Sequence, residues 1–156
     1  MRASRGGHMR RIGFFVLGLV SAAGIVSAQA QQESLQPLAT MKQLMVEIIH
    51  PASNEILLFV SRGSSQDEKQ WDRVRRSAIT LAESANLLTM RGRARDQGEW
   101  VKDAKLLADV GAAAYKAAEA KDAKALAALT ESLDASCTTC HKQYRPNVFP
   151  RAGDSK

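Results

Sequence analysis

The segment Leu126–Tyr144, with the sequence LAALTESLDASCTTCHKQY, decides the expected fold. Its apolar and sulfur-bearing residues recur at spacings of three and four, which places them on one face of an α-helix. The face consists of Leu126, Leu129, Leu133, Cys137, Cys140 and Tyr144. Pro146 follows and is expected to end the helix. This helix starts after Asp122 and is the last of four amphipathic segments.

The run Cys137-Thr138-Thr139-Cys140-His141 contains both cysteines of the chain. Cys-x-x-Cys-His is the attachment pattern of c-type haem, in which two thiols form thioethers with the haem vinyl groups and the histidine binds iron. Residues three and four apart share a helix face, so all three side chains reach one ligand. The sequence predicts one haem c, held by Cys137 and Cys140, with His141 as the proximal iron ligand.

Other functions of this motif remain open at this point. The two cysteines would form a disulfide in an oxidising compartment. A thioredoxin-like redox pair would need a βαβ setting, and the chain has no strand-like alternation. A bundle with a purely structural or adaptor role is a third class. A hydrolase is not expected, because His50 is the only other histidine after the N-terminal segment. We therefore do not expect an enzyme.

The N-terminal segment has the three parts of a secretory signal peptide. Residues 1–11 carry four arginines and no acid, residues 12–26 are apolar or small, and Ala28-Gln29-Ala30 fits a cleavage site. The apolar run is too short to favour a membrane span, although an uncleaved anchor is the alternative. We expect residues 1–30 to be removed and residues 31–156 to form one domain in a bacterial periplasm, with no membrane span.

The net charge of +6 comes largely from this signal peptide. The whole chain has 22 basic and 16 acidic residues, and removal of the four arginines leaves 18 minus 16, or +2. A high isoelectric point with this origin gives no reason to expect nucleic acid as a partner.

Three further segments show helical periodicity. The first spans about 37–61, with Pro37 expected in its first turn and Pro51 expected to kink it near Ile48. The second spans about 66–90 and begins with a capping box, Ser65 to Glu68; the third starts near Gln97, with Asp96 and Glu99 as a similar pair. The expected buried residues are Leu38, Met41, Met45, Ile48, Ile49, Ile56, Phe59 and Val60 in the first, Trp71, Val74, Ala78, Leu81, Ala85 and Leu88 in the second, and Trp100, Ala104, Leu107, Val110, Ala114 and Ala118 in the third.

Short links join the segments, at residues 62–65, 92–96 and 120–121. Short links force consecutive helices to lie antiparallel. The expected fold is thus all-α, an up-down-up-down antiparallel four-helix bundle with covalently bound haem. Haem would add apolar area to a core rich in alanine, so the apo-protein is expected to be marginally stable.

The chain resembles the class II cytochromes c, the cytochrome c-prime family, over residues 31–156. The run from Cys137 to Arg145 is similar to the haem motif of that family, and Trp100 is similar to a common family residue. The pair Leu44-Met45 resembles the segment over the distal haem face in the low-spin, Met-ligated branch. The resemblance implies a periplasmic single-electron carrier, periplasmic redox proteins as partners, and a homodimer formed through the first two helices.

The sixth iron ligand is not fixed by the motif. In an antiparallel bundle, Met41 and Met45 lie at the level of His141, whereas His50 lies about 20 Å along the helix and too far away. Met90 returns to the haem level and stays a candidate. The resemblance favours Met45, with Met41 as the alternative. An iron without a Met ligand would instead bind NO or CO, as five-coordinate members of the family do.

Arg145 follows His141 by four residues and is expected on the same side of the helix. Its charge would pair with a haem propionate or cover the proximal face. A surface arginine that stabilises the helix C-terminus is the alternative.

Overall fold

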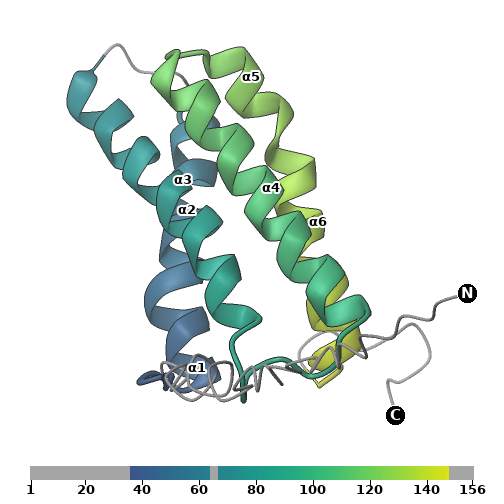
Figure 1. The fold of residues 1–156 in the computed structure, drawn as a ribbon. Coiled ribbons are helices and arrows are strands. Elements are labelled where there is room, and N and C mark those ends of the chain that lie inside the picture. The colour runs from purple at the N-terminus through teal and green to yellow at the C-terminus, as the bar shows by residue number, and fades with distance from the viewer. Residues whose placement is uncertain (1–35, 64–66, 148–156) are drawn as a thin grey trace, which may run out of the picture. The chain divides into compact units, whose positions relative to one another are not determined.

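The computed structural model describes residues 36–63 and 67–147 (Figure 1). The predicted signal peptide and Ser65 lie outside these described residues. Within them the chain is helical and contains no strand. The elements are α1 (Met41–Gln43), η1 (Leu44–Ile49), α2 (His50–Ser61), α3 (Glu68–Leu88), α4 (Glu99–Glu119), α5 (Ala123–Ala128) and α6 (Thr130–Tyr144). The elements α1, η1 and α2 run on as one helix, referred to below as the first helix. Because the described residues are helical and contain no strand, the predicted all-α class is confirmed, and the helices are compatible with a bundle.

The first helix starts at Met41 and not at Pro37. Thr40 is its N-cap: the Thr40 Oγ1 accepts from the Gln43 N–H (3.2 Å), and the Gln43 Oε1 accepts from the Thr40 N–H (3.0 Å). This reciprocal capping box satisfies two amide groups that would otherwise lack partners. Leu38 precedes the helix and is fully exposed, so its predicted place in the core is wrong.

The helix passes through Pro51 without a break. Instead of the predicted kink, the helix contains a π-helical turn, η1, just before the proline. Proline has no N–H to donate, and its ring collides with the carbonyl four residues earlier, here that of Glu47. The wider turn accommodates this, because the His50 N–H bonds to the Met45 carbonyl five residues back. Leu44 and Ile49, also five apart, are both buried.

The first helix is the one described helix long and apolar enough to cross a membrane by length and composition. Its apolar residues have a role within the domain, since Leu44, Ile49, Ile56 and Phe59 are buried in the core. The Phe59 ring lies 4.6 Å from the Trp71 ring of α3, centroid to centroid. Packing on α3 therefore accounts for part of the apolar character of this helix.

The contact between α3 and α4 is the most extensive in the domain. All six residues predicted for the inner face of each helix are buried. The two backbones come close at Gly111, where a Cβ atom would lie 2.6 Å from the Ala82 nitrogen. At one end of this contact, the Trp100 Nε1–H donates to the Leu88 carbonyl (2.8 Å).

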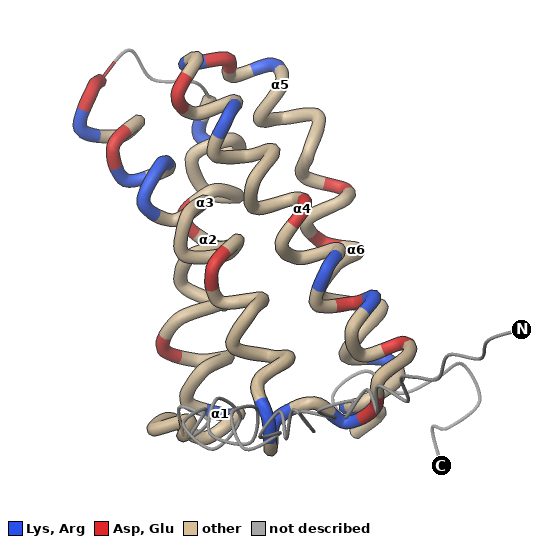
Figure 2. The backbone as a smooth tube through the Cα atoms, viewed as in Figure 1, with Lys and Arg blue, Asp and Glu red and all other residues tan. Residues whose placement is uncertain are grey.

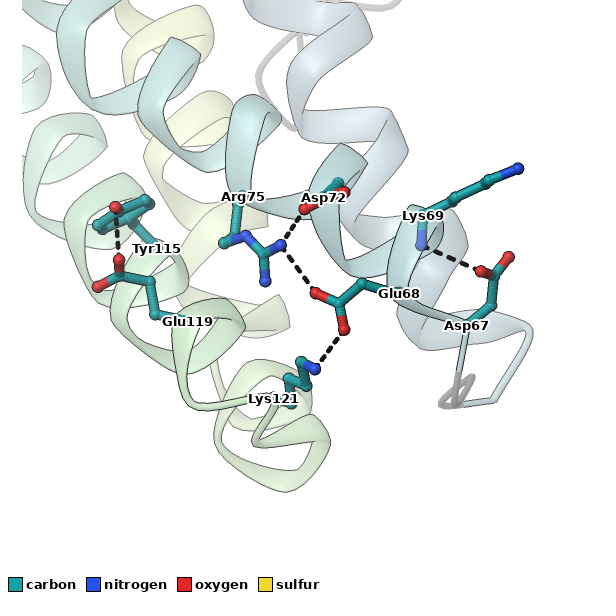
Figure 3. Close-up of polar contacts among 8 residues, drawn as sticks. All are labelled: Asp67, Glu68, Lys69, Asp72, Arg75, Tyr115, Glu119 and Lys121. Atoms are coloured by element: carbon teal, nitrogen blue, oxygen red, sulfur yellow. Dashed lines mark hydrogen bonds and ion pairs between the residues drawn. The ribbon is translucent and has the colours of Figure 1, made fainter.

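One ion pair joins the start of α3 to the link between α4 and α5, and a second, which shares Glu68, lies within α3 (Figure 3). Glu68 accepts hydrogen bonds from Lys121 and from Arg75, and both lower the pKa of its carboxyl, Lys121 more strongly. The N-cap of α3 is Asp67, which accepts from the Lys69 N–H (3.0 Å), so the helix does not start with the predicted box at Ser65. Because the pairs are exposed, they add little stability.

The last segment is not the single helix that its periodicity predicts. A turn at Leu129 separates α5 from α6, and the Leu129 N–H bonds to the Leu126 carbonyl, three residues back. The Thr130 hydroxyl donates to the Ala127 carbonyl (2.8 Å) beside this turn. Leu126 and Leu133 stay buried on either side of it, so the apolar face survives the interruption.

Replacing Gly111 with Ala should destabilise the domain. Alanine favours a helix over glycine by about 1 kcal/mol, but the added methyl group would collide with the backbone of α3. Overpacking of this kind costs about 1–3 kcal/mol. Urea unfolding should show a net loss, whereas the exposed neighbouring change Ala112→Ser should stay within about 0.5 kcal/mol. An unchanged unfolding midpoint for Gly111→Ala would contradict the close approach of α3 and α4.

Candidate functional site

Two adjoining cavities lie between the first helix, α4 and α6. The helix α6 packs mainly on α4 and the first helix mainly on α3, and neither α1 nor η1 makes an extensive contact with α6. The resulting space is divided into cavities of about 400 and 360 Å³ when space open to solvent is included, and about 40 Å³ of each is accessible to water. Both are lined by Met45, Trp100, Cys140 and His141.

The predicted attachment motif lies on α6 and faces this space. Cys137, Cys140 and His141 all line the larger cavity, together with the apolar side chains of Leu88, Ala104 and Leu107. Both cysteines are free thiols, so they are not joined in a disulfide. Each is partly buried, as is His141. The helical register thus brings two thiols and an imidazole to one apolar wall.

Burial controls the protonation of these groups. It raises the pKa of both thiols, and at Cys140 the nearby Asp103 adds to the effect and brings the pKa to about 12. Burial also lowers the pKa of His141, with a smaller contribution from the positive charge of Arg145. The thiols are therefore protonated at neutral pH, and the imidazole is favoured in its neutral form, which is the form that binds metals.

The candidate sixth ligands fall into two groups. Met41 and Met45 lie near His141: Met45 lines both cavities, and Met41 lines the smaller one. His50 is exposed and lines neither cavity. Met90 also lies outside their walls, where its sulfur is 3.9 Å from the Arg93 guanidinium. The cavity therefore brings the two early methionines, and not Met90, to the predicted haem motif.

Basic side chains border the smaller cavity. Arg145 lines it, and its backbone N–H donates to the His141 carbonyl (2.8 Å) at the end of α6. Arg95 lines the same cavity and was not predicted as a site residue. It belongs to the link between α3 and α4, residues 89–98, which carries several basic residues near this end of the helices (Figure 2). The cluster of Arg91, Arg93 and Arg95 indicated a basic segment in the sequence. Helical periodicity cannot predict which of these loop residues lies at the cavity.

Arg93, in the same link, has a structural role. Its guanidinium is buried and donates to the carbonyls of Ala39 (2.7 Å) and Leu87 (3.2 Å). These bonds tie the chain before the first helix to the end of α3.

Tyr144 closes the cavity at the end of α6. Its ring packs edge-on against Trp100 at a centroid distance of 4.9 Å, and its hydroxyl donates to the Asp96 carboxylate. The other carboxylate oxygen, Asp96 Oδ1, accepts from the Gly98 and Trp100 N–H groups (2.8 and 3.1 Å), but the N-cap of α4 is Gly98 and the predicted box-like pair with Glu99 does not form. Glu99 pairs with Lys102 instead. The bond to Tyr144 raises the pKa of that phenol to about 12.

Asp103 is a further cavity residue that sequence reasoning missed. It lines the larger cavity, it is 9% exposed, and it shares the buried stripe of α4 with Trp100 and Ala104. A charged residue three positions after Trp100, on an otherwise apolar stripe, was the signal that the sequence offered.

A second, more open hollow lies on the surface between the first helix and α3. Its lining includes Glu47, Glu55, Arg73 and Arg76 but no residue of the cysteine motif. Among residues 36–63 and 67–147, no group of three or more His, Cys, Asp or Glu side chains is arranged to hold a metal ion directly. The cavity at the motif is therefore the better candidate for a functional site.

Comparisons of the chain with protein-family models, with curated proteins and with solved structures found no match. The candidate site therefore depends on the residues themselves. Two free thiols, an imidazole and a thioether sulfur line the larger, mainly apolar cavity, and two arginines line the adjoining smaller one. This set fits the needs of a covalently bound haem, which requires thiols for its vinyl groups, soft or imidazole ligands for iron and cations for its propionates.

The thiol of Cys140 should react slowly in the folded apo-protein. Because its pKa is about 12 instead of 9.0, its thiolate fraction near neutral pH should be on the order of a thousandfold lower than in the unfolded chain. Iodoacetamide labelling followed by mass spectrometry, in folded protein and in urea, measures this. The variant Cys137→Ala isolates the signal of Cys140. Equal labelling rates in both states would show that the thiol is not buried.

Proposed function

We propose that this chain is a periplasmic class II c-type cytochrome that carries single electrons between redox proteins and is not an enzyme. In this proposal, residues 1–30 are a cleaved signal peptide and residues 31–156 form an up-down-up-down antiparallel four-helix bundle. One haem c is held by thioethers at Cys137 and Cys140. His141 is the proximal iron ligand. Bound haem supplies a reversible one-electron couple, and the chain sets its ligands and surroundings.

The observation that carries the proposal is the shared lining of the cavity by Cys137, Cys140, His141 and Met45. These residues come from opposite ends of the described sequence, in η1 and α6. A disulfide or a thioredoxin-like pair would need neither the histidine nor the methionine there. A structural bundle would fill the same space with apolar side chains.

Met45 is the proposed distal ligand. A thioether suits reduced haem iron and raises its potential, and a six-coordinate iron changes little between oxidation states. Met41 borders the same cavity and is the alternative ligand. If neither methionine binds, the open iron site would bind NO or CO, which is the alternative function.

Two arginines are proposed to hold the haem propionates. Arg95 and Arg145 both line the smaller cavity, and no ion pair to an acidic residue forms at either within the described part of the chain. Charged hydrogen bonds from guanidinium groups to carboxylates are among the stronger polar contacts in proteins. Arg145 would also keep His141 neutral through charge repulsion.

A homodimer through the first two helices is part of the proposal. Three large apolar side chains on these helices are exposed, Val46 at 52%, Ile79 at 45% and Leu58 at 37%. Burial of such residues would favour association. The partners in electron transfer are proposed to be other periplasmic redox proteins, and nucleic acid and membrane are not expected as partners.

Replacing both Cys137 and Cys140 with Ala should abolish covalent haem. The full chain would be produced in a bacterial periplasm that contains a c-type haem attachment system. After denaturing electrophoresis, the wild-type chain should stain for haem peroxidase activity and the double variant should not. A single replacement should leave one thioether and a weaker band. Haem that survives denaturation in the double variant, or a wild-type chain without haem, would refute the proposal.

Met45→Ala should convert a low-spin spectrum to a high-spin one, lower the reduction potential and allow CO to bind. Met90→Ala is the matched control, since Met90 does not line the cavity, and it should keep the wild-type spectrum. Absorption spectra of both oxidation states measure the spin state. If the Met41→Ala protein were high-spin and the Met45→Ala protein stayed low-spin, Met41 would be the distal ligand instead of Met45. A wild-type protein that is already high-spin and binds CO would favour the gas-binding function.

A further inference from the structure

Two buried side-chain atoms of the described residues have no hydrogen-bond partner. One is Arg93 Nε, whose guanidinium still donates through its other two nitrogens, and the second belongs to Asp103. Its Oδ2 is fully buried and has no hydrogen-bond partner there. By contrast, Ser53, Ser84 and Ser136 each donate to the carbonyl three residues earlier. A buried carboxyl with an unsatisfied oxygen costs folding free energy, and an apolar residue of similar size would not. Folding alone therefore does not account for Asp103.

The surroundings of Asp103 connect it to one cysteine. Asp103 and Cys140 line the same larger cavity, and the Asp103 carboxylate contributes to the raised pKa of the Cys140 thiol. The other charges that act on it, those of Glu99 and Asp96, are acidic, so no nearby cation explains its burial. Cys137 has a different neighbour, since its sulfur lies 3.9 Å from the Ser136 hydroxyl. The carboxylate is thus placed to act on Cys140 and not on Cys137.

We propose that Asp103 is a positioning residue for the covalent attachment of haem at Cys140. A cysteine on a helix has a choice of side-chain rotamers, and the buried, unpartnered Asp103 oxygen offers the Cys140 S–H an acceptor that selects one of them. In that rotamer the Cys140 Sγ stays in the cavity that both residues line, where the reacting group would lie. Restricting a reactant to the productive geometry is a large contribution to the rate of bond formation. This inference rests on the proposed function.

The attachment step is balanced without a redox partner. The thiol adds across the carbon–carbon double bond of a haem vinyl group. The S–H bond breaks, a C–S bond forms at the vinyl carbon next to the ring, and the proton goes to the terminal vinyl carbon. No group leaves and nothing is oxidised. Asp103 stays unchanged overall, because it holds the thiol only before the C–S bond forms.

The test compares Asp103→Leu, which removes the acceptor, with Asp103→Asn, which keeps an acceptor oxygen in nearly the same shape. Asp109→Asn is the control, because Asp109 lies on the same helix, is exposed and pairs with Lys105 (2.6 Å). The full chains would be produced together with a c-type haem attachment system and then alkylated while denatured. Peptide mass spectrometry then counts unreacted thiols at Cys137 and Cys140 separately.

In Asp103→Leu, unreacted Cys140 should increase on the order of tenfold over the wild type, with Cys137 unchanged. Asp103→Asn should restore most of the Cys140 thioether, and Asp109→Asn should equal the wild type. The haem-free Asp103→Leu protein should also melt at a higher temperature than the haem-free wild type, because it lacks the unsatisfied carboxyl.

Several results would overturn the inference. Complete thioethers at both cysteines in Asp103→Leu would show that Asp103 has no part in attachment. Equal losses at Cys137 and Cys140, or a lower melting temperature of the haem-free variant, would show that Asp103 supports the fold. A wild-type chain without covalent haem would overturn the proposed function and this inference with it. The first two results leave the proposed function intact, so the two failures are distinguishable.

Discussion

The close approach of α3 and α4 at Gly111 is the constraint on which the rest of the domain depends. Because no side chain separates the two backbones there, the helices form the most extensive contact of the domain. Each then has another face to cover: the first helix packs on α3, and α6 packs on α4. The outer helices are held by different partners and not by each other near the cysteine motif. The cavity is the consequence of this arrangement.

The site combines groups that differ in what burial does to them. Thiols are kept protonated, imidazole is kept neutral, and the methionine sulfur is unaffected because it carries no proton. The polar contacts of Tyr144 with Asp96 and of Trp100 with Leu88 lie at the border of the cavity and fix its walls. The charged contacts around Glu68 lie instead at the start of α3, so they stabilise helix ends without entering the site.

Helical periodicity predicted α3 and α4 well, because a single apolar stripe on each explains its burial. It failed at local features. Proline at position 37 indicated a helix start, but the reciprocal bonds of Thr40 and Gln43, a pattern also readable in the sequence, start it later. The turn at Leu129 has no glycine or proline to mark it. The cysteine motif could be read directly. Height along the bundle predicted that Met41 and Met45, and not His50, lie near the motif, but it could not exclude Met90, which lies outside the cavity walls. The sequence could not predict that Asp103 and Arg95 line the cavities. The burial of Asp103 and the loop position of Arg95 both depend on tertiary packing.

The π-helical turn before Pro51 gives the first helix one more residue than an α-helix of the same length would hold. In an α-helix, each added residue rotates everything beyond it by about 100°. In evolutionary terms the turn resembles a one-residue insertion that the helix absorbed. Because of this extra residue, the direction around the helix axis at Met41 and Met45 is set separately from the direction at the buried residues Ile56 and Phe59. The side of the helix that faces the cysteine motif and the side that faces α3 can thus change independently, so one helix can acquire or lose a ligand without losing its packing.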